Sequence, residues 1–178
     1  DRIAEAIIEA DETGVPMTVM CLDLDHFKEL NDSFGHIAGD HALRELGERL
    51  SKLNSDNITI ARVGGDEFVV LLHHQNRPDV ALASANARAV AQDILDCIAI
   101  PIFINNNHRA KLSGSIGIAH YPSDGEDAEA ILFHAGILFF GNGRGIPLQA
   151  STIIQSASGN GKRYAGSPLP AAMPRRQP

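Results

Sequence analysis

The sequence reads Arg62-Val63-Gly64-Gly65-Asp66-Glu67-Phe68 between two apolar segments rich in β-branched residues, at 58–61 and 68–72. Apolar segments joined by paired glycines predict a β-hairpin whose turn is Gly64-Gly65. The glycines remove every Cβ from the tip, so a bulky anionic group can touch the backbone there. Asp66 and Glu67 follow this bare backbone, and they would repel a phosphate unless a divalent cation lay between them.

A second pair of acids, Asp23 and Asp25, ends the apolar segment 17–25, which predicts a β-strand. Residues two apart on a strand share a face. A carboxylate on a strand end and another on a hairpin turn form a workable Mg²⁺ site for a nucleotide. Magnesium takes one or two carboxylates and completes its shell with phosphates and waters. Asp23 alone would be an ordinary strand-terminal acid, but its combination with the hairpin acids favours the metal site.

Length and composition limit the class of protein. The 178 residues suit one domain, and a content of 44% hydrophobic and 21% charged residues is typical of a soluble globular protein. The net charge of −7 argues against a general nucleic-acid binder. No membrane-spanning run or signal peptide is visible, so we expect a cytoplasmic protein without a membrane segment. Cys21 and Cys97 lie in apolar patterns and are predicted to be buried thiols rather than a disulfide.

Local patterns predict the order of helices and strands. Helices are expected over 2–12, 39–53, 79–98 and 127–140. Strands are expected over 17–25, in the hairpin 58–72, near 101–104 and over 110–120. We interpret His73-His74, at the end of the hairpin, as a solvated strand terminus whose two side chains point to opposite faces. The mixture predicts an α/β (α+β) fold in which helices flank a mostly antiparallel central sheet.

The acidic stretches belong to a longer series of motifs. The series comprises Asp23 to Asp32, Phe34-Gly35-His36, Gly39-Asp40, Arg62 to Phe68 and Ser115 to Ala119. In this order and spacing it resembles the GGDEF domain of diguanylate cyclases, and is most similar to those in GGDEF–EAL tandem proteins. The resemblance implies a fold similar to nucleotide cyclase and polymerase palm domains. It also implies that a homodimer, with one GTP in each subunit, condenses two GTP into cyclic di-GMP and releases pyrophosphate.

The resemblance assigns the residues around the metal. The cofactor, Mg²⁺ or Mn²⁺, would be held by Asp23, by the backbone carbonyl of Leu24 and by Asp66. Asp66 would also assist deprotonation of the attacking hydroxyl, and Glu67 is its neighbour in the motif. Arg62 has two interpretations, stabilisation of negative charge in the site or pairing with a hairpin acid.

The resemblance also assigns residues to the phosphates. Gly64 and Gly65 would wrap them, and Phe27 and Lys28 match positions at the terminal phosphates. A cation at that position is physically sensible, so Lys28 is counted among the catalytic residues. Without the motif, Lys28 would be interpreted as a solvated lysine on a helix.

Asn31 and Asp40 match the pair that reads guanine in the family. Guanine presents an N1–H and an N2 amine, which a carboxylate can accept, and acceptors that an asparagine amide can serve. Asp40 also fits a simpler role, because an acid near a helix N-terminus is favoured by the helix dipole. His36 matches a motif histidine for which a structural hydrogen bond is as good an interpretation as a chemical role.

Three departures from the family pattern bear on activity. The chain begins after the family's opening motif, and Ser55 and Ile58 replace the Arg and Asp of the product-inhibition motif, so feedback there is not expected. The C-terminal signature is degenerate, because Gly136 replaces an Asp and the phosphate-binding lysine has no counterpart. Arg144 remains a candidate for the phosphates. We therefore assign 1–145 to the GGDEF domain and 146–178 to a largely disordered tail outside the family pattern.

These departures leave alternatives to an active cyclase. One is a catalytically impaired, GTP-binding regulatory domain that was linked to an EAL phosphodiesterase domain. Another is a nucleotidyl-transferring palm domain of a different class, which the guanine-reading pair disfavours. In either cyclase or regulatory form, the partners expected are GTP, a second subunit, and sensor or EAL domains in a longer parent protein, but not nucleic acid.

Overall fold

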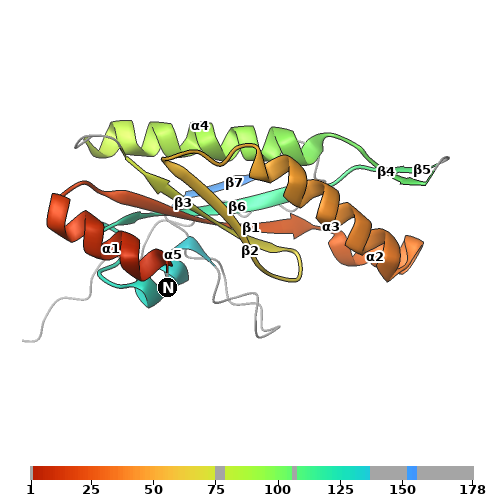
Figure 1. Cartoon of the computed structure of the whole chain (residues 1–178), viewed down its shortest axis with the longest axis horizontal. Coiled ribbons are helices and arrows are strands. Elements are labelled where there is room, and N and C mark those ends of the chain that lie inside the picture. The colour runs from red at the N-terminus through yellow and green to blue at the C-terminus, as the bar shows by residue number, and fades with distance from the viewer. Residues whose placement is uncertain (1, 75–78, 106–107, 137–151, 156–178) are drawn as a thin grey trace, which may run out of the picture.

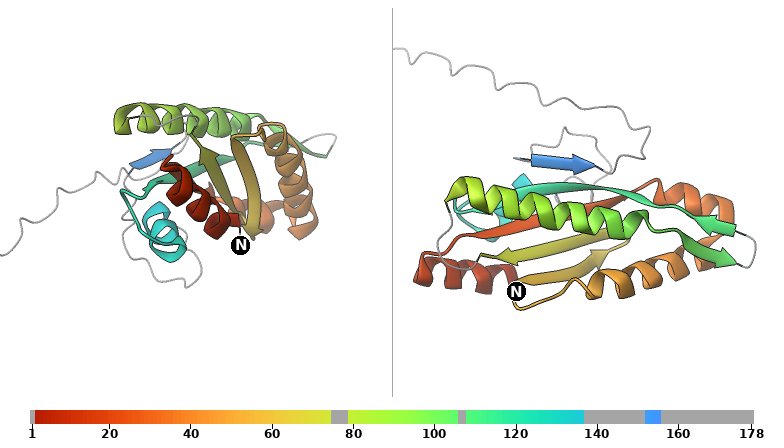
Figure 2. Two further views of the ribbon diagram at one scale, coloured as in Figure 1. Left: turned by 60° about the vertical axis from the view of Figure 1, so that its left-hand side comes forward. Right: turned by 90° about the horizontal axis from the view of Figure 1, so that it is seen from above.

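The computed structural model describes residues 2–74, 79–105, 108–136 and 152–155. Within these ranges an antiparallel sheet forms the middle layer, and helices lie on both of its faces (Figure 1, Figure 2). The expected class, a mostly antiparallel sheet flanked by helices, is confirmed. No helix in the described ranges is long and apolar enough to cross a membrane.

The elements follow one another along the chain. The helices are α1 (Arg2–Thr13), α2 (Phe27–Phe34), α3 (His36–Ser51), α4 (Val80–Ala99) and α5 (Ala128–Ala135). The strands are β1 (Met17–Asp25), β2 (Ile58–Gly64), β3 (Glu67–His73), β4 (Ile102–Asn105), β5 (His108–Ala110), β6 (Ser113–Tyr121) and β7 (Thr152–Gln155). The main sheet has the order β2-β3-β1-β6-β7, and β4 and β5 form a separate two-stranded ribbon.

Strand β1 is the centre of the sheet. It pairs antiparallel with β3 on one side and with β6 on the other. Because side chains alternate along a strand, Met20 and Leu22 pack in the core under α2, α3 and α4, whereas Val19 and Cys21 pack against α1 and α5. Burial on both faces explains why the strand is an almost continuous apolar run until it reaches Asp23.

The hairpin forms where the sequence predicts it, but its turn lies one residue further on. Gly64 ends β2 and pairs with Glu67 at the start of β3, so the turn residues are Gly65 and Asp66 rather than Gly64 and Gly65. Gly65 has a φ of 40°, in the region that glycine tolerates best. The pairing shifts between Arg62 and Gly64, as in a β-bulge, and this extra residue displaces the turn.

Helix α5 is shorter than the predicted span of 127–140. Its N-cap is Asp127, whose Oδ1 accepts a hydrogen bond of 2.8 Å from the backbone N–H of Ala130. It ends at Ala135, because Gly136 adopts a φ of 104° and its N–H turns back to the carbonyl of Leu132 at 3.0 Å. The prediction was therefore wrong about where this helix ends.

Other differences are smaller. The helices predicted over 2–12, 39–53 and 79–98 correspond to α1, α3 and α4, with ends shifted by one to three residues. The strand predicted over 110–120 is divided into β5 and β6. The 146–178 segment contributes β7, which pairs with β6 at the edge of the sheet. The rest of that segment, apart from 152–155, and Arg144 lie outside the described residues.

The sequence predicts the burial of two pairs of side chains, the two cysteines and the adjacent histidines. Neither cysteine forms a disulfide, as expected; Cys21 is buried as predicted, whereas Cys97 is only half-buried. His73 and His74 do point to different partners, but the interpretation as a solvated terminus is wrong for His74, which is only 7% exposed. His74 is buried because it bonds to Thr18 of β1, a contact between residues far apart in sequence.

Candidate functional site

A group of acids collects where β1 ends and the β2–β3 hairpin turns, at the same end of the sheet (Figure 1). Asp23 lies opposite Glu67 on β3 and opposite Ser115 on β6. Its pKa is raised from 3.8 to about 7, chiefly by burial. The negative charges of Asp66, Asp25 and Glu67 raise the same pKa further. Asp23, near the end of β1, and Asp66, in the hairpin turn, are thus close enough to repel each other.

The remaining acids of the group differ in their surroundings. Burial raises the pKa of Glu67, and the charge of Asp66 adds to the effect. Asp25 is half-buried, and its Oδ1 accepts a hydrogen bond of 2.9 Å from the hydroxyl of Ser115. Ser115 thereby ties Asp25 to β6. Asp23 and Asp25 look equivalent in the sequence, but in the structure Asp25 accepts a hydrogen bond from Ser115, whereas Asp23 lies near Asp66.

The hairpin tip is held by its own arginine. The Nε of Arg62 donates a hydrogen bond of 2.8 Å to the carbonyl of Gly65. Gly64 and Gly65 are exposed, and a Cβ added at Gly65 would meet nothing within 4 Å. The tip therefore offers bare backbone to solvent, as the sequence predicts. Arg62 thus holds the turn through its backbone, and its predicted effect on the negative charge of the site stays a prediction.

The turn from β1 into α2 places the next two candidates. His26 adopts a φ of 60° just before the helix, and its Nδ1 lies 2.8 Å from Oε1 of Glu29. This hydrogen bond raises the pKa of the exposed His26. Phe27 is buried in the core, so it can contribute to a phosphate site only through its backbone. Lys28 is exposed in the first turn of α2, where backbone N–H groups have no acceptor within the helix.

The candidate base-reading residues lie where α2 and α3 touch. A Cβ added at Gly39 would lie 1.9 Å from Oδ1 of Asn31 and 3.2 Å from Cζ of Phe27. No side chain fits there, so glycine is required for α2 and α3 to approach this closely. Asn31 is consequently pressed against the turn of α3 that carries the exposed Asp40. The structure brings the two candidates to neighbouring helices, next to the end of β1.

Two residues that build this site, Gly39 and Ser115, belong to the sequence motifs but have no predicted role in them. Gly39 sets the spacing of α2 and α3, and a glycine inside a helical pattern was the available signal. Ser115 holds Asp25, and nothing short of the β1–β6 register indicates that contact. Leu24 has a buried side chain, so only its backbone carbonyl can face a ligand. His36 is exposed.

Residues 1–139 match the family described as diguanylate cyclase, GGDEF domain. The chain belongs to this GGDEF family. The GGDEF domain of TpbB from Pseudomonas aeruginosa, known from a crystal structure, superposes with a TM-score of 0.67 at 34% identity, covering 75% of this chain and 80% of that one. The expected palm-like GGDEF fold is thereby confirmed.

The chain also has relatives among longer signalling proteins of Pseudomonas aeruginosa. It is 38% identical over 142 residues to MucR, a bifunctional diguanylate cyclase and cyclic di-GMP phosphodiesterase, covering 76% of this chain and 20% of MucR. It is 36% identical over 124 residues to the cyclic di-GMP phosphodiesterase NbdA, covering 70% of this chain and 15% of NbdA. The chain thus spans a fifth or less of the length of these two relatives.

Proposed function

We propose that this chain is a diguanylate cyclase domain, which as a homodimer condenses two GTP into cyclic di-GMP with release of pyrophosphate. Membership of the GGDEF family supports the reaction class. The observation that carries the proposal is the meeting of Asp23 with Asp66 and Glu67 at one end of the sheet. Helix α2, which carries Asn31, begins directly after this end, and α3, which carries Asp40, follows α2, so a base and its phosphates can be held together.

The acids fit a divalent cation. Asp23 and Asp66 repel each other, and a cation between them relieves that repulsion. We propose that Mg²⁺ or Mn²⁺ is held by these two carboxylates and by the carbonyl of Leu24. When bound, the metal supplies positive charge that polarises the α-phosphate. The described residues contain no group of three or more His, Cys, Asp or Glu side chains that could hold a metal, so phosphates and water complete the shell.

The other residues bind and orient GTP. Gly64 and Gly65 let the phosphates approach the hairpin backbone, and the backbone of Phe27 and the ammonium of Lys28 hold the terminal phosphates. The 3′-hydroxyl of the GTP on one subunit attacks the α-phosphate of the GTP on the other, and pyrophosphate leaves. Asp66, with Glu67 beside it, removes the proton of the attacking hydroxyl. The contribution of Arg144 to the phosphates remains part of this proposal.

Asn31 and Asp40 select the base. The carboxylate of Asp40 accepts from N1–H and the N2 amine of guanine, and the amide of Asn31 serves the acceptors. Adenine lacks the N2 amine and the N1–H, so it would leave Asp40 without a donor. The contact of Asn31 with Gly39 supports this assignment, because it holds the asparagine beside the turn that carries Asp40.

A second candidate function is a catalytically impaired regulatory domain that binds GTP. It is favoured by the end of α5 at Gly136, after which the sequence has no lysine before Lys162. A missing cation at the triphosphate lowers turnover more than binding, because charge on the α-phosphate and leaving group grows in the transition state. NbdA, which is similar to this chain, is described only as a phosphodiesterase. In either case we propose sensor or EAL domains in a longer parent protein, and a cytoplasmic location where GTP is available.

The deciding experiment is incubation of the chain with GTP and Mg²⁺ or Mn²⁺, followed by chromatography for cyclic di-GMP and pyrophosphate. Both products, in a ratio of one cyclic di-GMP to two pyrophosphates, establish the cyclase. GTP-selective binding by calorimetry without product establishes the regulatory domain. A different nucleotide product indicates a palm domain of another class, and absence of both binding and turnover refutes the proposal.

Base choice is tested separately. Asp40→Ala should reduce the preference for GTP over ATP by about 100-fold, since it removes the acceptor for two guanine donors. Glu48→Ala, which removes an exposed acid from the same helix, is the matched control and should leave the preference unchanged. Equal affinity of the unmodified chain for GTP and ATP would exclude Asn31 and Asp40 as base readers.

A further inference from the structure

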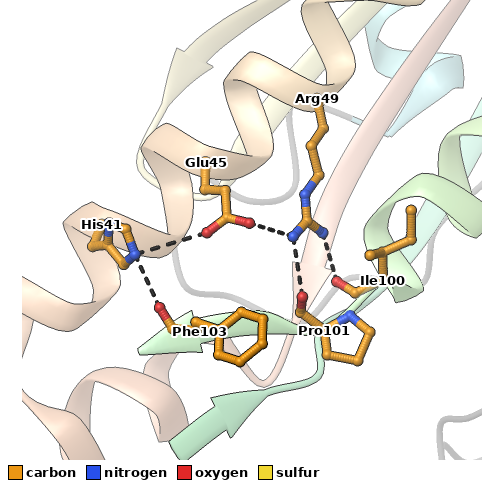
Figure 3. Close-up of polar contacts among 6 residues, drawn as sticks. All are labelled: His41, Glu45, Arg49, Ile100, Pro101 and Phe103. Carbon is orange, nitrogen blue, oxygen red and sulfur yellow. Dashed lines mark hydrogen bonds and ion pairs between the residues drawn. The ribbon is translucent and has the colours of Figure 1, made fainter. Parts of the chain in front are cut away.

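One face of α3 carries a row of three polar side chains that reaches the junction between α4 and β4 (Figure 3). The residues are His41, Glu45 and Arg49, spaced four apart, so they lie above one another on the helix surface. Their partners are the backbone carbonyls of Ile100, Pro101 and Phe103. We call these three side chains the α3 ladder.

Arg49 binds the C-terminal end of α4. Its Nη1 donates a hydrogen bond of 2.6 Å to the carbonyl of Ile100, and its Nη2 donates one of 3.1 Å to the carbonyl of Pro101. Ile100 is the C-cap of α4, and carbonyls at a helix C-terminus have no donor within the helix. The guanidinium also complements the negative end of the helix dipole. Only 16% of the Arg49 side chain is exposed, although the two carbonyls that it binds belong to exposed residues.

Glu45 and His41 extend the contact along α3. Glu45 accepts a hydrogen bond from Nη2 of Arg49, and its other carboxylate oxygen lies 3.7 Å from Nε2 of His41. The same Nε2 donates a hydrogen bond of 3.0 Å to the carbonyl of Phe103 in β4. The ladder thus fixes three turns of α3 to one short segment of backbone.

The position of α3 matters because this helix carries Asp40, one of the two candidate base-reading residues, in its first turn and a half. Asp40 immediately precedes His41, and Gly39 holds α3 against Asn31 of α2. The acids Asp23 and Asp66 belong instead to the sheet. A nucleotide that contacts both groups therefore senses how α3 is placed relative to the sheet.

Contacts other than the α3 ladder restrict the position of α3 relative to the sheet less strongly. Between α3 and the hairpin runs an open groove, lined among others by Leu43, Gly47, Ile60 and Arg62. A Cβ added at Gly47 would meet nothing within 4 Å. The inner face of α3 packs in the apolar core, but apolar contacts are not directional. The ladder bonds are directional, and they connect α3 to α4, whose own inner face is buried against the sheet.

We propose that the α3 ladder is a positioning device, which holds the base-reading helices in register with the acids at the end of β1. The proposal rests on the proposed binding of GTP at this site. His41, Glu45 and Arg49 act through Asp40 and Asn31, not on the nucleotide itself. Loss of the ladder should leave base selection intact, because Asn31 and Asp40 move together, but it should uncouple the base from the metal-bound phosphates.

The test compares Arg49→Met with the unmodified chain. The control is Lys52→Met, which removes an exposed cation just beyond the same end of α3. Affinity for GTP and for ATP is measured by calorimetry with and without Mg²⁺, so that catalytic turnover is not required. Arg49→Met should lose about tenfold of the Mg²⁺-dependent gain in GTP affinity, because small misplacement of bound groups is costly. Its preference for GTP over ATP in the absence of Mg²⁺ should stay within about twofold. Arg49→Lys, which keeps the charge but not the planar fork, should recover part of the gain.

A second measurement is independent of the nucleotide. Hydrogen exchange of the backbone amides over 38–45 and in β4 should become at least about tenfold faster in Arg49→Met, while β1 and β3 keep their protection. Unchanged amide exchange in α3 would show that the α3 ladder does not hold this helix in place, even if GTP binds as proposed. If amide exchange became faster but Mg²⁺ increased GTP affinity as much as in the unmodified chain, the positioning role would be overturned. It would also be overturned if the variant lost the Mg²⁺-dependent gain and the preference for GTP over ATP together. A folded, unmodified chain that binds no GTP would refute both the proposed function and this role.

Discussion

The two ends of β1 show opposite ways of placing polar groups in a sheet. At the C-terminal end, Asp23 is surrounded by other acids, and its pKa is raised to about 7. At the N-terminal end, the buried Thr18 lies between two histidines, with its hydroxyl 2.8 Å from Nε2 of His74 and 2.8 Å from Nδ1 of His120. The first end gathers like charges, and the second completes a hydrogen-bonded network.

The histidine end is satisfied by the protein itself. Burial lowers the pKa of His74 and of His120, so both are neutral near pH 7. A neutral imidazole has one donor and one acceptor nitrogen, and a hydroxyl can donate once while it accepts. Thr18 can therefore donate to one histidine and accept from the other, and Ser84 lies 3.2 Å from the remaining nitrogen of His120. This end needs no ligand.

The acidic end is not satisfied in the same way. Ser115 donates to Asp25, but burial and then the charges of three neighbouring carboxylates raise the pKa of Asp23. Like charges held together reduce stability, and proteins keep such arrangements mainly where a ligand or a reaction uses them. The difference teaches that buried polar groups mark a functional site when their partners are absent from the fold, rather than simply because they are buried.

The largest expected effect is the loss of GTP turnover when an acid is removed from the C-terminal end of β1. Asp66→Asn removes the charge that Asp23 opposes, and the cation proposed between them loses a ligand. Turnover of GTP should fall by at least about 100-fold, since electrostatic stabilisation at a phosphoryl site is lost. Product formation is measured by chromatography, and Mg²⁺-dependent GTP binding by calorimetry serves if turnover is too low. Asp56→Asn, at an exposed acid before β2, is the control. Equal behaviour of the two variants would remove the distinction between the acids.

The next effect breaks the histidine end. Thr18→Val keeps the shape of the side chain but leaves a nitrogen of His74 and one of His120 without their hydroxyl partner. Unfolding free energy should fall by about 2 kcal/mol, the usual cost of unsatisfied buried polar groups. Urea denaturation at pH 7.5 measures it. Thr59→Val, on the half-buried strand β2, should cost less than about 0.5 kcal/mol. A comparable loss in both variants would show that the network adds nothing specific.

A smaller effect is expected on stability, because removal of the charge of Asp23 should stabilise the protein. The folded pKa of Asp23 is about 7, above its ordinary value of 3.8, so the folded state binds more protons over this range. Stability therefore falls as the pH rises from about 4 to about 7 and stays low above it. Without metal at pH 8, Asp23→Asn should raise the unfolding free energy by about 1 kcal/mol, after allowance for solvent screening. The gain should vanish near pH 4, and added Mg²⁺ should stabilise the unmodified chain more than the variant.

Asp25→Asn is the control for this measurement. It lies on the same strand face as Asp23, but its carboxylate accepts a hydrogen bond from Ser115. Asp25→Asn keeps an amide oxygen that can accept this bond, and it removes only one of the charges that act on Asp23, so it should stabilise the protein at pH 8 less than Asp23→Asn does. If Asp25→Asn stabilised it as much as Asp23→Asn, general repulsion in a protein of net charge −7 would explain the result better than a local site.

The smallest effect is the order in which the histidines titrate. As the pH falls, His26 should gain its proton first, because its hydrogen bond with Glu29 raises the pKa, and His74 and His120 should follow below their ordinary value of 6.5. Since the unfolded histidines bind protons more readily, His74 and His120 reduce stability below about pH 6.5 and have no effect above it. NMR titration of the ring protons measures the order. Titration of all three together would contradict a buried neutral network.

Much of the acidic end could be predicted from the sequence. Asp23 follows an apolar run, and the hairpin glycines precede two acids, so local pattern alone indicates both halves of the site. The turn was misplaced by one residue because the bulge between Arg62 and Gly64 arises from cross-strand pairing. The end of α5 was misplaced because apolar residues on both sides of Gly136 mask a glycine that ends the helix.

The histidine end could not be predicted, for a physical reason. A pair such as His73-His74 at the end of a strand is exposed or buried according to what covers it, and local periodicity does not contain that information. The partner of His74 is Thr18, 56 residues away along the chain. The same holds for the α3 ladder, where Arg49 meets carbonyls more than 50 residues further on. Side chains that bind distant backbone look, in the sequence, like ordinary polar residues of a helix surface.

Strand β1 also keeps its two ends apart. Thr18 and Asp23 are separated by five residues, or roughly 16 Å along an extended strand, and the strand between them is buried and apolar. Changes at sites so far apart, with no shared partner, combine additively. Substitutions that change acid tolerance at one end of β1 should therefore leave the proposed nucleotide binding at the other end unchanged. A variant of His74 or His120 can suit the protein to a different pH while the acids that face the hairpin keep their arrangement.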